Sequence, residues 1–124
     1  MDEEEEDTEQ KVSKNISPSC SVHEIIEVMA DFINYLSVSL YQDQFTQSHH
    51  DSYVMIHTIY NTISSKPHIP PSLYDIEQFY NNINYLGNVT YTDDPDYYTY
   101  KRKLRKYIMD LRIVNLNHTP TTTE

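Results

Sequence analysis

The residues of this chain whose types could support chemistry are its histidines, its single cysteine and a few paired carboxylates. His49, His50 and Asp51 form the densest cluster, and His57 follows it further along a predicted helix, so a metal ion is one interpretation of this group. The adjacent histidines argue against it, because neighbouring side chains rarely converge on one ion. We therefore predict neither a metal site nor a cofactor.

Nucleophilic and phosphate-binding motifs are equally sparse. Cys20 and His23 have the spacing of a thiolate–imidazole pair, but nothing in the sequence supplies the third group that would orient them. Gly87 is the only glycine. A P-loop, a dinucleotide-binding fingerprint and the phosphate-binding loop of a kinase each need several glycines, so all three are excluded.

The other candidates for acid–base chemistry are two carboxylate pairs. Glu24 and Glu27 fall on the solvent face of a predicted helix, and Asp93 and Asp94 fall in a predicted turn. Neither pair has the apolar surroundings that would raise the pKa of a carboxyl group for acid catalysis. The sequence thus predicts a protein that is not an enzyme and has no catalytic residue.

Any functional site would have to be positioned by segments in which apolar residues recur with a helical period. The first begins at a capping box formed by Ser21 and Glu24. After a polar loop over residues 37–50, a second helix is predicted from Asp51 to about Ile63, and its Val, Ile and Thr content leaves a strand as the alternative. The apolar stripe of the first helix comprises Val22, Ile25, Ile26, Met29, Phe32, Ile33 and Leu36.

Two more helices follow the proline-containing break at residues 66–71. Ser72 is the predicted N-cap of the third helix, and Gly87 is predicted to end it in the left-handed conformation that favours glycine. Asp96 is the predicted N-cap of the fourth. Together the segments predict an all-α protein of about four short helices, without the alternation of strands and helices that builds a parallel sheet.

Charge and polarity predict the domain boundaries. Seven of the 19 acidic groups lie in the first nine residues, so residues 1–20 are expected to be an acidic disordered tail. Residues 21–114 form the predicted helical domain, and residues 115–124 a second disordered tail. The chain shows no signal peptide and no apolar run long enough to span a bilayer, which indicates a cytoplasmic or nuclear protein without a membrane partner.

The basic residues are concentrated near the C-terminus, where six of the nine fall between residues 101 and 112. One interpretation is a solvated helix face; the other is that the acidic run screens this helix or mimics an acidic partner of it. The few cations and the net charge of −10 argue against nucleic-acid binding. The candidate partner-binding residues are Lys101, Arg102, Lys103, Arg105 and Lys106.

Between residues 70 and 111 a proline, an aromatic-rich helix ending in a leucine, and an acid-x-Pro-Asp-Tyr turn opening a last helix follow one another. In this order they resemble the C-terminal part of the catalytic lobe in the casein kinase 1 group, which includes the tau-tubulin and vaccinia-related kinases. The family-like motif consists of Pro95, Asp96, Tyr97 and Leu104.

The resemblance implies a truncated kinase C-lobe in which Pro95 stiffens the turn, Asp96 caps the last helix and Tyr97 packs on the lobe. It includes neither the nucleotide lobe nor the catalytic loop, so it implies no phosphoryl transfer. The implied function is a non-catalytic remnant of a serine/threonine kinase that serves as a protein-binding scaffold or decoy. Its central helix would lack its usual cover, and the exposed apolar surface would favour oligomers.

The alternative is an unrelated small helical adaptor, such as a viral one, that binds a host protein. Its binding surface would be an apolar groove or the basic last helix. Both interpretations predict a protein partner, and they differ in the origin of the chain.

Overall fold

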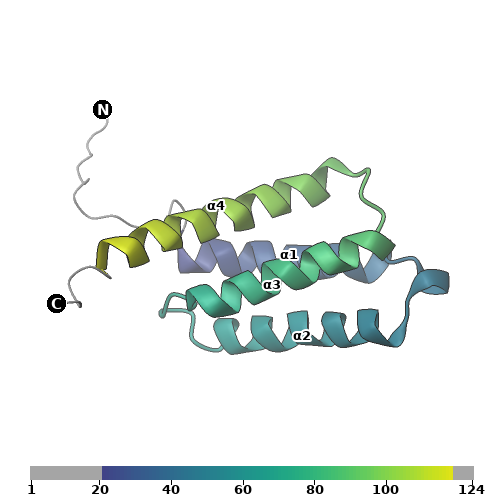
Figure 1. Ribbon diagram of the computed structural model, residues 1–124, viewed down its shortest axis with the longest axis horizontal. Helices are drawn as coiled ribbons and strands as arrows, with labels where there is room; N and C mark the ends of the chain where they lie inside the picture. Colours follow the sequence, from purple (N-terminus) through teal and green to yellow (C-terminus); the bar gives the residue numbers. More distant parts are fainter. Residues whose placement is uncertain (1–20, 119–124) are drawn as a thin grey trace.

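The computed structural model describes residues 21–118, and four α-helices account for most of this range (Figure 1). The prediction of an all-α protein is confirmed, and the described residues include no strand. Two short 3-10 helices lie in the connections. The elements are α1 (Val22–Ser39), η2 (Gln42–Gln44), α2 (Gln47–Ser64), α3 (Leu73–Leu86), η3 (Gly87–Val89) and α4 (Pro95–His118).

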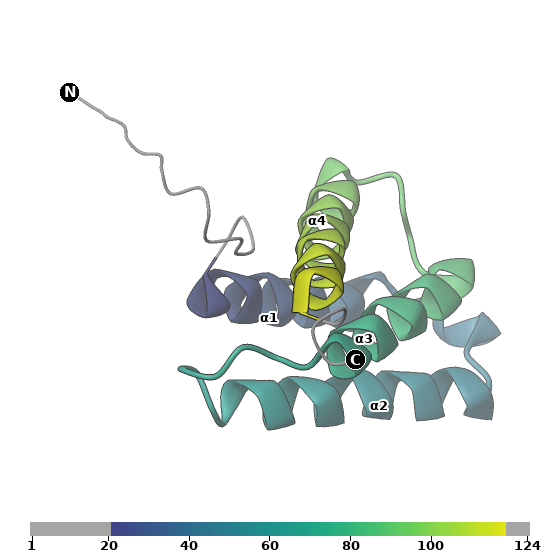
Figure 2. The same ribbon diagram turned by 60° about the vertical axis from the view of Figure 1, so that its left-hand side comes forward.

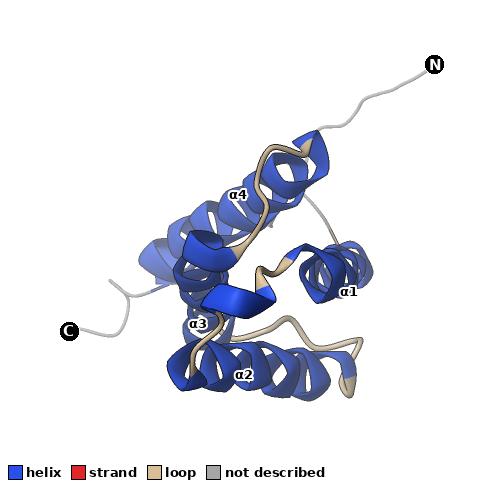
Figure 3. Ribbon diagram, turned by 90° about the vertical axis from the view of Figure 1, so that its right-hand side faces the viewer, coloured by secondary structure: helices blue, strands red, loops and turns tan. Residues whose placement is uncertain are grey.

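The four helices run alternately in opposite directions. Helix α1 packs against α2 and α4, and α3 packs against the same two helices. The α1–α2 and α3–α4 connections lie at one end of the molecule (Figure 1). The start of α1, the α2–α3 connection and the end of α4 lie at the other end. Figures 2 and 3 show α4 on the side of α1 and α3 that lies away from α2, so one side of α4 is left facing outward.

The core forms between the four helices because each presents one apolar stripe to the others. On α1 the side chains of Ile25, Met29, Phe32 and Leu36 are completely buried. The bare central helix that a truncated kinase lobe would leave is therefore not found, because α2 and α4 cover the stripe of α1. The helices of the described part of the chain thus cover one another's apolar side chains.

The two connections at one end are joined by backbone hydrogen bonds. The amide of Tyr41 donates to the carbonyl of Val89 at 2.7 Å, and the amide of Tyr91 donates to the carbonyl of Ser39 at 2.8 Å. We call this pair of bonds the loop clasp. It satisfies backbone groups that a connection would otherwise expose, and it fixes the start of α4 relative to the end of α1.

Helix α2 begins four residues earlier than predicted, and it is a helix, so the strand alternative is wrong. The amide of Thr46 donates to Nδ1 of His49 at 3.0 Å, which places a histidine where a capping box usually has a glutamate. Since α1 also continues to Ser39, the predicted polar loop over residues 37–50 is much shorter than expected.

Gly87 does not adopt the predicted left-handed conformation. Its φ of −57° and ψ of −24° are right-handed, and the chain continues into η3. The reason for a glycine here is space, because a Cβ atom on residue 87 would lie 2.9 Å from the hydroxyl oxygen of Tyr97. The predicted cap at Ser72 is confirmed, since its hydroxyl accepts the amide of Asp75 at 3.1 Å.

The boundaries of α4 also differ from the prediction. The helix begins at Pro95, and Oδ1 of Asp94 accepts the amide of Asp96 at 2.9 Å, so Asp94 takes the capping role predicted for Asp96. At the other end α4 continues to His118, four residues past the predicted limit of the domain at 114. Residues 115–118, predicted to begin the second tail, are thus helical. The tail predicted over residues 1–20 and the rest of the second tail, residues 119–124, lie outside the described residues.

Candidate protein-binding surface

Helix α4 carries six of the seven basic residues in the described range. Its apolar stripe faces the core, with Leu104 completely buried and Tyr107, Ile108 and Leu111 nearly so. The cations are thereby turned toward solvent on the remaining sides of the helix. The exposed ones among the predicted partner-binding residues are Arg102, Lys103, Arg105 and Lys106.

The residues of the family-like motif position α4. Pro95 is the first helical residue, where its fixed φ suits a helix and its missing amide costs nothing. Tyr97 is only 3% exposed, and its ring meets that of Phe32 edge-on at a centroid distance of 5.5 Å. Asp96 is exposed and Leu104 is buried. Pro95, Tyr97 and Leu104 thus hold the basic helix in place, and Asp96 contributes its backbone amide to the cap.

Lys101 differs from the other cations of α4 because it is partly buried. Its Nζ atom lies 5.4 Å from the centroid of the Tyr97 ring and 5.9 Å from that of Tyr80. Burial lowers the pKa of Lys101. Burial also raises the pKa of the Tyr97 hydroxyl, and neighbouring tyrosines add to that effect. Lys101 thus links α3 to α4 and is the least available of the candidate residues.

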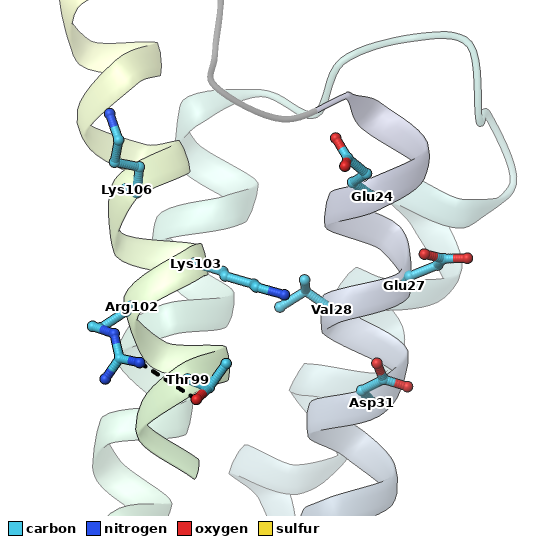
Figure 4. A pocket seen from close by; sticks show the side chains of 8 residues that line it. All are labelled: Glu24, Glu27, Val28, Asp31, Thr99, Arg102, Lys103 and Lys106. Carbon is cyan, nitrogen blue, oxygen red and sulfur yellow. Dashed lines mark hydrogen bonds between the residues drawn. The ribbon is translucent and has the colours of Figure 1, made fainter. Parts of the chain in front are cut away.

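A groove of about 440 Å³ runs between α1 and α4 (Figure 4). Its α1 side is acidic and its α4 side is basic, and Figure 4 shows the Lys103 side chain reaching across toward Val28. No ion pair between described residues joins the two sides. The lining residues are Glu24, Glu27, Val28, Asp31, Thr99, Arg102, Lys103 and Lys106.

On the α3 side of α4 the surface forms a second, smaller hollow of about 210 Å³. It is lined by Tyr80, Tyr98, Lys101, Arg102 and Arg105. Further along the helix, Arg112 is held by Glu77 of α3, with nitrogen–oxygen distances of 2.6 and 2.9 Å. Arg102 and Arg105 have no such carboxylate partner among the described residues.

The outward side of α4 combines cations with exposed apolar side chains. Tyr98, Arg102, Arg105, Met109 and Ile113 follow one another at spacings of four, three, four and four residues, which return to one side of a helix. We call these residues the outer face of α4. Tyr98, Met109 and Ile113 are 48%, 46% and 48% exposed. The cations of this face were predicted from the sequence and its apolar members were not, although their helical spacing could have revealed them.

Two other candidates from the sequence, His49 and Glu24, take structural roles. His49 caps α2, and its ring stacks on that of Tyr85 at 5.0 Å. Glu24 completes the capping box of α1 by accepting the Ser21 amide at 2.7 Å. Cys20 lies outside the described residues. Over residues 21–118 no cluster of three histidine, cysteine, aspartate or glutamate side chains is placed to hold a metal ion.

None of the helices described is long and apolar enough to cross a membrane. Comparisons of the chain with protein-family models, with curated proteins and with solved structures find no match. The resemblance to the casein kinase 1 group therefore stays a prediction.

Proposed function

We propose that the protein is a non-catalytic protein-binding module whose outer face of α4 binds an acidic amphipathic helix of a partner. The observation that carries this proposal is the interleaving of exposed Tyr98, Met109 and Ile113 with Arg102 and Arg105 on one side of a well-anchored helix. Tyrosine, methionine and arginine are the residue types enriched in protein interfaces.

The chemistry of the partner follows from that pattern. The apolar members of the outer face would pack against apolar side chains at helical spacing, as in other helix–helix interfaces. Carboxylates on the same partner helix would meet the guanidinium groups of Arg102 and Arg105, and such pairs can be bidentate. Apolar contact supplies most of the affinity, and the charges set the orientation and the choice of partner.

A narrow acidic ligand suits this surface better than a nucleic acid does. The described range holds eleven carboxylate side chains against seven cations, and three of the carboxylates, Glu24, Glu27 and Asp31, line the groove beside α4. A polyanion that covered α4 broadly would be repelled by them, whereas a helix on the outer face would border the groove only at Arg102 and would be repelled less.

A second candidate is the scaffold or decoy role of a casein kinase 1-like remnant. The position of Pro95 at the start of α4 and the burial of Tyr97 support it, because the resemblance implies that Pro95 stiffens the turn and that Tyr97 packs on the lobe. The self-contained core favours the adaptor instead. Both origins are compatible with binding through α4.

The test is a selection of helical peptides displayed on yeast, from a library in which the charged positions vary between Glu and Lys. We expect Glu to be enriched, and we expect the double variant Arg102→Glu/Arg105→Glu to enrich Lys instead. Lys66→Glu, a charge reversal of an exposed lysine outside α4, is the matched control and should leave the Glu preference unchanged.

For a selected acidic peptide, the double charge reversal should weaken binding at least about tenfold, and Tyr98→Ala should also weaken it. Val54→Ala, which truncates an exposed apolar side chain on α2, is the control for Tyr98. Equal enrichment of Glu and Lys, or affinities unchanged by the α4 variants, would overturn the proposal. Tighter, salt-sensitive retention on duplex DNA would favour the nucleic-acid alternative.

A further inference from the structure

We propose that the acidic run at residues 2–9 of the same chain occupies the outer face of α4 and competes there with the partner. This inference rests on the proposed function, and it adds the regulation of that surface. The run contains seven carboxylates and no apolar side chain. It is therefore complementary to the cations of the outer face and not to Tyr98, Met109 and Ile113.

The point at which the chain enters the fold brings the run close to α4. Residue 21 precedes the first turn of α1, and Glu24 in that turn lines the same end of the groove as Lys106 (Figure 4). Residues 10–20 can span at most about 40 Å when extended. The stretch of α4 from Arg102 to Lys106 is only about 6 Å long, so the tether reaches all of it.

Electrostatics selects the outer face over the groove. Glu24, Glu27 and Asp31 form the α1 side of the groove and would repel a run of carboxylates. Arg105 does not line the groove and lies in the hollow on the α3 side of α4, and Arg102 lines both this hollow and the groove. Both are exposed, without a carboxylate partner among the described residues. The favourable position for the run is therefore over Arg102 and Arg105, where it would block the proposed interface.

Tethering makes even weak contacts effective. A segment attached through about ten residues has an effective concentration in the millimolar range, so individually weak ion pairs can populate the docked state. Because the run offers no apolar side chain, a partner that fills the apolar positions of the outer face would displace it. An acidic molecule without apolar contacts would not displace the run. The run would therefore restrict binding to partners that make apolar contacts with the outer face.

The docking test uses the full chain with one spin label, placed by Thr8→Cys together with Cys20→Ser, which removes the only native thiol. We expect the label to broaden the amide signals of α4 around Arg102 to Lys106, and to leave those around Val54 on α2 unchanged. The broadening should disappear in Arg102→Glu/Arg105→Glu and at about 1 M salt, and persist in Lys66→Glu.

A matched full-chain variant replaces the seven carboxylates of residues 2–9 by the corresponding amides. It should lose the broadening and bind the selected acidic peptide about fivefold more tightly, because docking removes binding-competent molecules. Absence of broadening in the native chain, or equal affinities of the two chains, would overturn this inference even if the peptide binds. Broadening without any peptide binding would support the docking and overturn the proposed function instead.

Discussion

The contact between Gly87 and Tyr97 joins the end of α3 to the first turn of α4, and it depends on the absence of a side chain at residue 87. Tyr97 is buried against Phe32 and Tyr35, so its ring has little room to move. Its hydroxyl oxygen occupies the space beside Gly87 that a Cβ atom would need. The glycine is thus explained by a neighbour about ten residues away in sequence, and not by its own backbone conformation.

We expect Gly87→Ala to destabilise the fold by about 1–3 kcal/mol, because the new methyl group forces the Tyr97 ring out of its position. In the Tyr97→Phe background the same substitution should cost clearly less, since the opposing oxygen is gone. The measurement is a double-mutant cycle by urea denaturation. If the costs of the two substitutions simply add, the contact does not determine the choice of glycine.

At the scale of elements, the decisive boundary is the start of α4, because it sets which residues face outward. Asp94 precedes the helix, and its carboxylate accepts the amide of Asp96. Pro95 fixes the first helical residue. A cap at Asp96 would have started the helix two residues later.

Asp94→Ala should therefore reduce the free energy of unfolding by about 1 kcal/mol, the usual cost of a lost N-cap. The neighbouring substitution Asp93→Ala is the matched control, because Asp93 is an exposed carboxylate next to the cap. We expect the control to change stability by less than about 0.5 kcal/mol. Thermal or urea unfolding followed by circular dichroism measures both, and equal effects would place the cap elsewhere.

Apolar periodicity was sufficient to predict the four helices and most of their buried faces, because burial repeats with the helical period. The capping box at Ser21 and the cap at Ser72 were also predictable from residue types. The start of α2 was missed because His49 replaces the expected glutamate. The role of Gly87 and the outer face of α4 depend on tertiary packing, which a single sequence does not display.

At the scale of the whole molecule, the core is closed by the described residues alone, and every helix contributes to it. Two copies that met symmetrically at the centre of the outer face would bring Arg102 and Arg105 of both copies close together. Like charges in contact are unfavourable, so this surface disfavours self-association while it favours an acidic partner.

We therefore expect a monomer with one reversible thermal transition, whose calorimetric and van't Hoff enthalpies agree. Sedimentation at micromolar concentrations and scanning calorimetry measure these two properties. A dimer that persists in Arg102→Glu/Arg105→Glu, or a broad transition with dye binding, would instead support a fragment that needs a missing cover. Lys66→Glu should behave like the native chain in both measurements.

The loop clasp and the placement of the two described ends have a mechanical consequence. Residues 21 and 118 lie at the same end of the molecule, and the clasp joins the connections at the opposite end (Figure 1). A pulling force applied between those residues would act first on the contact of α1 with α4. The two helices would separate progressively, from the pulled end toward the loop clasp. The interface between α1 and the basic helix α4 would therefore separate first. Tension on the chain would free α4 while α2 and α3 are still paired.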